Sequence, residues 1–132
     1  MNDEEYKAQV ARLDALMEQW HDNLGLKWWR VTHEYVREAS HFQVDGKDSP
    51  DTAACARADW RYMEATISWN IPIIATFDDE RLENVYLHEC CHILINETRG
   101  PSLKAFMAHE ERVCSLLAKS FIWVRDAARG KG

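Results

Sequence analysis

The sequence lacks any long hydrophobic run. No segment approaches the roughly 20 consecutive apolar residues that a membrane-spanning helix requires, so we expect no membrane partner. The acidic start Met1-Asn2-Asp3-Glu4-Glu5 has neither the basic nor the apolar region of a secretory signal peptide. We therefore expect a cytoplasmic protein.

Clusters of basic residues are also scarce. The formal net charge is −6, and basic residues gather only in the C-terminal stretch Lys119–Lys131. A nucleic-acid-binding surface needs concentrated Lys and Arg to neutralise phosphates. We therefore expect no nucleic-acid partner, and nothing in the composition predicts the oligomeric state.

The four cysteines do not resemble a disulfide framework. Cys90 and Cys91 are adjacent in one predicted helix and cannot easily pair with each other, and no signal peptide directs the chain to an oxidising compartment. We therefore expect reduced thiols.

The patterning that is present predicts an α+β fold in a single domain, residues 1–132. Apolar residues at spacings of three and four predict helices, whereas alternation predicts strands. We expect a small three-stranded, mostly antiparallel sheet. The expected elements are an N-terminal helix over Asp3–His21, strands around Trp29–Tyr35, Ala54–Arg61 and Met63–Asn70, a loop over His41–Asp51, a helix from Asp78 to about Asn96, and a C-terminal helix from about Leu103 to Arg125 after the break Gly100-Pro101-Ser102.

The stretch His88-Glu89-Cys90-Cys91-His92 is an HExxH pentapeptide inside one of these helices. Residues four apart share a helix face, so His88 and His92 can bind one metal ion. Glu89 then lies beside the metal, where it can take a proton from a water molecule. Cys90 and Cys91 project away from the line of the two histidines, which disfavours them as ligands.

Two histidines leave a catalytic zinc site incomplete, so a third protein ligand is expected. The last helix offers His109, Glu110 and Glu111. Periodicity predicts that Glu110 lies nearest the centre of an apolar stripe formed by Phe106, Val113, Leu117 and Val124. Glu111 lies on a second stripe of small residues, Cys114, Ser115 and Ala118, which would let two helices approach closely and would place a hydroxyl group where it can orient a ligating histidine. On this reasoning both glutamates remain candidates, with His109 behind them.

HExxH followed 19 positions later by Glu111 resembles the pattern of the gluzincins, the thermolysin-like clan of zinc peptidases. Their third ligand lies in a Glu-x-x-small-Asp/Asn-x-x-small motif, and residues 111–118 are similar, with Ser115 in place of Asp or Asn. Over residues 20–122 the chain more closely resembles small metallopeptidases encoded by tailed phages and prophages, for which the cytoplasm would be that of the host cell. The resemblance implies a minimal zincin-like domain with Zn²⁺ as cofactor, His88, His92 and Glu111 as metal ligands, and Glu89 as catalytic base, with Glu110 as the alternative third ligand.

The resemblance also implies a zinc-dependent metallopeptidase that hydrolyses a peptide or protein substrate. By the same resemblance, the strand Met63–Asn70 of this chain would lie at the sheet edge and pair with an extended substrate. Thr66, Ser68 and Asn70 would then face solvent or the cleft. A side chain that stabilises the oxyanion is common in such enzymes, and the candidates are His33, His41, Tyr62 and Tyr86. The alternative function is a non-catalytic, zinc-containing binding or regulatory module.

Overall fold

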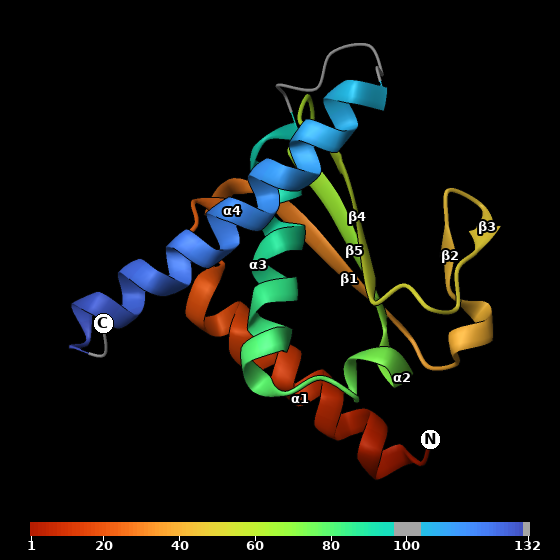
Figure 1. Cartoon of the computed structure of the whole chain (residues 1–132). Helices are drawn as coiled ribbons and strands as arrows, with labels where there is room; N and C mark the ends of the chain where they lie inside the picture. Colours follow the sequence, from red (N-terminus) through yellow and green to blue (C-terminus); the bar gives the residue numbers. More distant parts are fainter. Residues whose placement is uncertain (97–103, 131–132) are drawn as a thin grey trace.

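The computed structural model describes residues 1–96 and 104–130, which form helices around a small mixed sheet (Figure 1). The predicted α+β class is confirmed, whereas Gly100-Pro101-Ser102 and the predicted helix start at Leu103 lie outside the described residues. The elements in chain order are α1 (Asp3–Trp20), η1 (Leu26–Trp28), β1 (Arg30–Val36), η2 (Ala39–His41), β2 (Gln43–Val44), β3 (Lys47–Asp48), β4 (Ala54–Asp59), β5 (Glu64–Asn70), α2 (Ile71–Ile74), α3 (Asp79–Leu94) and α4 (Lys104–Ala128).

The three-stranded sheet has the order β1-β5-β4, and this order corrects two predictions. The sheet is not mostly antiparallel, because β1 pairs with β5 in parallel and β4 pairs with β5 antiparallel. The strand predicted at the edge, β5, lies in the centre. Two of its polar side chains bond within the protein: the Ser68 hydroxyl donates to Glu34, and the Asn70 amide nitrogen donates to the carbonyl groups of Pro50 and Thr52. The edge strand next to α3 is β4.

The predicted loop over 41–51 contains a short hairpin of β2 and β3. Asp45 and Gly46 connect the two strands with φ angles of 52° and 79°. Both angles lie in the left-handed region that a two-residue type I′ turn requires, and Asp-Gly is a preferred pair for that turn.

The hydrophobic core lies between the sheet and helices α1 and α3. Asn2 begins α1 with a capping box in which its side chain accepts a hydrogen bond from the Glu5 N–H. Trp69 on β5 is fully buried and stacks on Tyr86 of α3, with ring centroids 6.0 Å apart. Leu13 of α1 is fully buried in the same cluster, so the two helices share one core.

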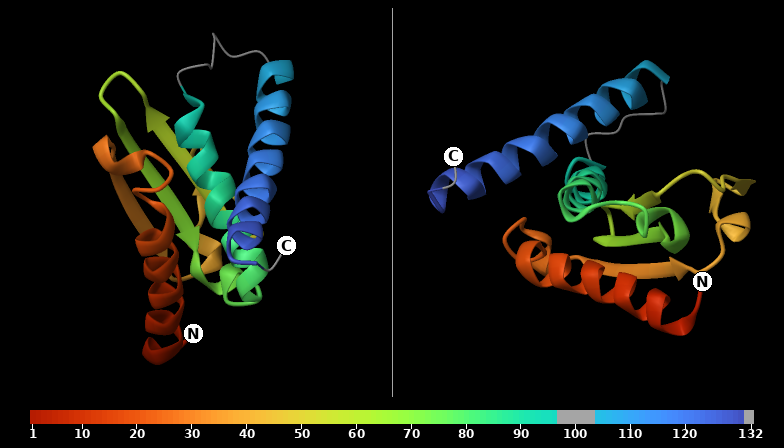
Figure 2. Two further views of the ribbon diagram at one scale, coloured as in Figure 1. Left: turned by 90° about the vertical axis from the view of Figure 1, so that its left-hand side faces the viewer. Right: turned by 60° about the horizontal axis from the view of Figure 1, so that its bottom comes forward.

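Helix α4 forms the outermost layer and lies against α3 on the side away from the sheet (Figure 2). The inner face of α4 includes small residues, of which Cys114 and Ala118 are buried, and the larger Phe121 and Ile122 also pack against the core. The predicted apolar stripe is wrong as a buried face, because Val113 and Val124 are 44% and 59% exposed. The small side chains let the two helices approach closely, which outweighs the greater hydrophobicity of the other stripe. The Phe106 side chain lies outside what the structure describes.

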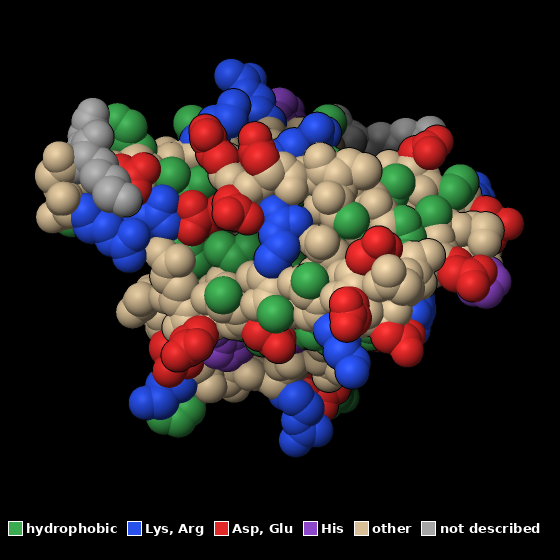
Figure 3. Space-filling view, turned by 90° about the horizontal axis from the view of Figure 1, so that it is seen from below, with side chains coloured by type: hydrophobic (Ala, Val, Ile, Leu, Met, Phe, Trp, Pro, Cys, Tyr) green, Lys and Arg blue, Asp and Glu red, His purple; other side chains and the backbone are tan. Residues whose placement is uncertain are grey.

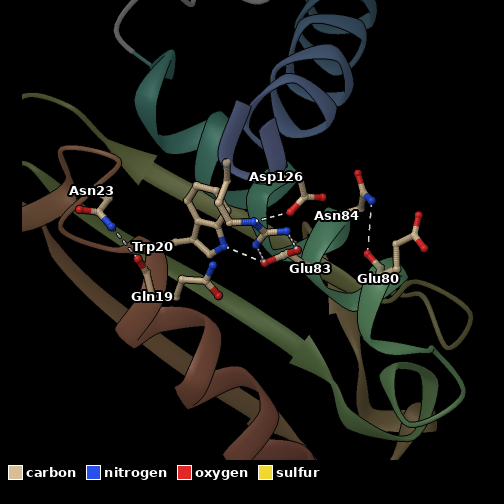
Figure 4. A network of polar contacts seen from close by, with 8 residues as sticks. Gln19, Trp20, Asn23, Glu80, Glu83, Asn84 and Asp126 are labelled. Carbon is tan, nitrogen blue, oxygen red and sulfur yellow. Dashed lines mark hydrogen bonds and ion pairs between the residues drawn. The ribbon is translucent and has the colours of Figure 1, made fainter. Parts of the chain in front are cut away.

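A polar network fixes the C-terminal half of α4 to α1 and α3 (Figure 4). Glu83 of α3 accepts a hydrogen bond from the Trp20 indole at 3.0 Å and two from the Arg125 guanidinium at 2.6 and 3.0 Å. The Arg125 guanidinium also lies over the Trp20 ring, 5.5 Å from its centroid. A bidentate, mostly buried ion pair of this kind fixes orientation as well as distance.

Two observations bear on the expected partners. Among the helices over 1–96 and 104–130, none combines the length and apolar character needed to cross a bilayer. On the face shown in Figure 3, acidic and basic side chains are interspersed rather than gathered into one basic field.

Candidate metal centre

The two histidines of the HExxH segment project from α3 toward α4. Asp78 caps this helix as predicted, its side chain accepting a hydrogen bond from the Arg81 N–H at 2.8 Å. His88 and His92 lie one turn apart, with their rings edge to face and their Nε2 atoms 3.1 Å from each other. The helix therefore brings the two imidazoles to one point, as their spacing predicts.

Glu111 of α4 completes a group of three metal-ligating side chains with the two histidines. Its Oε1 atom lies 2.7 Å from His92 Nε2, and its Oε2 atom lies 3.0 Å from His88 Nε2. A tetrahedral zinc ion with bonds near 2.05 Å holds its ligand atoms about 3.3 Å apart. The observed separations of 2.7, 3.0 and 3.1 Å are shorter than that value by up to about 0.6 Å, so the three side chains would move apart slightly around an ion, and the His₂Glu donor set suits zinc. The residues present therefore fit a zinc ion.

Glu110 occupies a different position from Glu111, although the two are adjacent in the chain. It is only 3% exposed, and its Oε1 atom lies 2.9 Å from Nδ1 of His92, the ring nitrogen that faces away from the group of three. A histidine that uses Nε2 as a ligand carries its proton on Nδ1, which then donates to a carboxylate or another acceptor. Glu110 is thus placed as the acceptor that orients His92. His109 is exposed and lies outside the metal-ligating group found among the described residues.

Ser115 has the equivalent position for the other histidine. Its Oγ atom lies 3.2 Å from Nδ1 of His88. A polar side chain at this position was expected to orient a ligating histidine, and the geometry agrees with that expectation. Both imidazoles are therefore held through their outer nitrogens by side chains of α4.

Glu89 lies beside this group in a buried position between α3 and β4. Burial raises the pKa of its carboxyl group to about 7, while the neighbouring His92 acts in the opposite direction. The backbone of Ala56 on the edge strand lies near the carboxyl group of Glu89 and also acts to lower its pKa. Glu89 is 8% exposed.

An open cleft of about 1240 Å³ runs over these residues. It is bounded by α3, α4, the edge strand β4 and the segment 44–52, and its lining includes His88, Glu89, His92 and Glu111. Arg57, Arg81, Asn84 and Lys119 also line it, and sequence reasoning did not single them out. They come from three separate elements, so no local pattern marks them as members of one site.

None of the four oxyanion candidates lines the described part of the cleft. Nδ1 of His33 accepts a hydrogen bond from the indole of Trp69, and burial lowers the His33 pKa. Tyr86 is buried in the core, while His41 and Tyr62 are exposed on η2 and on the β4–β5 turn. Cys90 and Cys91 are buried outside the ligand group, and burial raises their pKa values to about 12 and about 11.

Comparison with known proteins gives limited similarity. No family model matches the sequence. Protein MMS22-like of Bos taurus is 32% identical over 85 residues, which cover 64% of this chain and 6% of that protein. Protein MMS22-like of Homo sapiens is 32% identical over 70 residues, which cover 53% of this chain and 5% of that protein. No solved structure matches. The chain thus spans about one-twentieth of the length of these curated relatives.

Proposed function

We propose that the chain is a zinc-dependent metallopeptidase that hydrolyses peptide bonds in a peptide or protein substrate. The observation that carries the proposal is the convergence of His88, His92 and Glu111 beside a buried Glu89 in an open cleft. Ligands and a neighbouring carboxylate in this arrangement are what zinc-assisted hydrolysis requires.

His88, His92 and Glu111 would hold the zinc ion, and the cleft leaves room for water and substrate on its open side. A bound zinc ion would supply Lewis acidity and lower the pKa of a water molecule. Glu110 and Ser115 would keep the two imidazoles in the tautomer and orientation that ligation needs, because each contacts an Nδ1 atom.

Glu89 is the group placed to move protons. It lies on the same helix turn as His88, and its carboxyl group faces the cleft. A carboxylate in this position can take a proton from water and deliver it to the leaving amine.

The edge strand β4 supports recognition of an extended substrate. One side of β4 pairs with β5, and the other borders the cleft. A free strand edge beside a site can bind a peptide main chain by adding a strand to the sheet. We therefore assign to β4 the pairing with extended substrate that was expected of residues 63–70.

The test is Glu89→Gln in zinc-loaded protein, assayed on fluorescein-labelled denatured casein and on a proteome-derived peptide library read by mass spectrometry. We expect cleavage by the unmodified chain, a loss of about 10²–10⁴-fold in the variant, and unchanged zinc content. Glu18→Gln, an exposed change on α1, is the matched control. Retained turnover in Glu89→Gln would contradict the assigned role. A zinc-loaded wild-type chain that cleaves nothing would instead support the non-catalytic module.

A further inference from the structure

The outer face of α4 exposes a continuous row of large apolar side chains. Val113, Leu116, Trp123 and Val124 are 44%, 64%, 67% and 59% exposed. Monomeric proteins often expose single hydrophobic residues, but four on one helix face form a patch that indicates an interaction site. Because α4 is the outermost layer, this face points away from the core (Figure 2).

Three of these residues, Val113, Leu116 and Trp123, belong to a heptad repeat that spans two heptads of the helix. Val113, Ser120 and Ala127 recur every seven residues, and Leu116 and Trp123 recur with the same period three residues later. These are the a and d positions of a coiled-coil seam. All five of these side chains are exposed, while Cys114 and Ala118 on another face of the same helix are buried against α3. The helix therefore has two separate packing faces, of which the chain itself uses one.

We propose that this outer face of α4 pairs with the same face of a second copy of the chain, with the two helices antiparallel. In an antiparallel pair, a positions lie opposite d positions. Val113 then faces the partner's Trp123, and Ser120 faces the partner's Leu116. Each contact places a smaller side chain against a larger one and occurs twice, as an isologous two-fold interface requires.

Charges beside the seam favour this orientation. Arg112 and Asp126 both occupy the position that precedes a. Within its own chain, Asp126 also pairs through Oδ1 with Arg125 at 3.0 Å. Antiparallel pairing places Arg112 of each chain next to Asp126 of the other, giving two ion pairs of opposite charge. Parallel pairing would instead place Arg112 beside Leu117. At the centre of the antiparallel pair, Lys119 of one chain lies next to Lys119 of the other. This is the one like-charged contact among the positions that precede a.

Self-complementarity in size and in charge identifies a second copy as the occupant. The seam spans only two heptads of one helix, so we expect a weak dimer with a dissociation constant of about 10–100 µM. The surface is independent of any metal, because no residue of the seam belongs to the ligand group.

Sedimentation velocity of the full chain between about 5 and 500 µM tests the pairing, with the range set by the expected affinity. We expect a concentration-dependent monomer–dimer equilibrium that Leu116→Glu and Trp123→Glu each abolish. Trp28→Glu is the matched control, because Trp28 is 76% exposed but lies on η1. A monomer at every concentration, or equal loss of the dimer in the control, would overturn the proposal.

A charge-reversal cycle keeps the test decisive if an apolar variant fails to fold. Arg112→Asp and Asp126→Arg should each weaken dimerisation about tenfold, because each creates two like-charged contacts. The double variant should restore it, since both pairs regain opposite charges. Lys119→Gln should strengthen the dimer by removing the central repulsion. Additive weakening in the double variant would exclude the antiparallel register.

Discussion

The adjacent acids Glu110 and Glu111 provide a sharp test of how the site is built, because the structure gives them different roles. Glu111 places both carboxylate oxygens against the Nε2 atoms of the two histidines, whereas Glu110 contacts Nδ1 of His92. Glu111→Gln removes the charge of a ligand, whereas Glu110→Gln removes the charge of the carboxylate that contacts Nδ1 of the ligand His92. The two variants should therefore weaken zinc binding to different degrees.

The magnitude follows from the Glu110 contact. Loss of an orienting partner typically lowers metal affinity by about 10–100-fold. The glutamine of Glu110→Gln can still accept a hydrogen bond from Nδ1, so we expect about a tenfold loss, against about a hundredfold for Glu110→Ala. Glu111→Gln should cause a larger loss than either change at position 110. Ser115→Ala should resemble Glu110→Gln, because its 3.2 Å contact orients the other histidine.

Competition with a chromophoric zinc chelator measures these affinities, and circular dichroism verifies that each variant folds. Glu18→Gln is the control, since Glu18 is an exposed acid on α1 outside the metal group. It should leave zinc affinity unchanged. If Glu110→Gln abolished zinc binding while Glu111→Gln retained it, Glu110 would be the ligand and the reasoning would be refuted.

Two further predictions concern stability. Glu83→Gln should lower the free energy of unfolding by about 1–3 kcal/mol, as measured by urea titration, because it weakens the Arg125 ion pair. The exposed control Glu80→Gln should change the free energy of unfolding by less than about 0.5 kcal/mol. Equal effects of the two variants would show that the network is not stabilising. Burial lowers the pKa of His33 below its usual 6.5, with His21 acting in the same direction and Asp14 opposing it. The unfolded chain therefore binds more protons than the folded chain, and stability should fall as pH drops through 6.5 and below. His33→Gln should flatten this dependence of stability on pH.

The sequence was sufficient where the structure depends on local periodicity. The spacing of His88 and His92 fixes their relation on any α-helix, and the cap at Asp78 determines where that helix begins. The separation of two residues along a helix does not depend on the rest of the fold. This part of the site was therefore predictable without tertiary information.

Sheet order was not predictable in the same way. Strand β5 was expected at the sheet edge from the family resemblance, yet it lies between β1 and β4. The Ser68 hydroxyl donates to Glu34 and the Asn70 amide nitrogen donates to the carbonyl groups of Pro50 and Thr52, and the sequence alone does not show these partners. The β2–β3 hairpin did carry a local signal, the Asp45-Gly46 pair.

The rotation of α4 decided the third member of the metal group. Hydrophobicity alone places the stripe of Val113 and Val124 inward, but the structure buries Cys114 and Ala118 instead. The buried face must accommodate close helix contact as well as exclude water, and residue size controls the first of these. The alternative of Glu110 or Glu111 depended on this rotation, which only the packed structure provides.

The central claim is that His88, His92 and Glu111 form a zinc site, and zinc stoichiometry tests it most directly. The full chain would be purified, loaded with a small excess of Zn²⁺, passed through a desalting column and measured by elemental analysis beside His92→Ala and the exposed control His109→Ala. We predict about one zinc ion per chain in the unmodified protein and in His109→Ala, and a loss of most of it in His92→Ala. Zinc that is substoichiometric in the unmodified chain, or equal in all three proteins, would contradict the account.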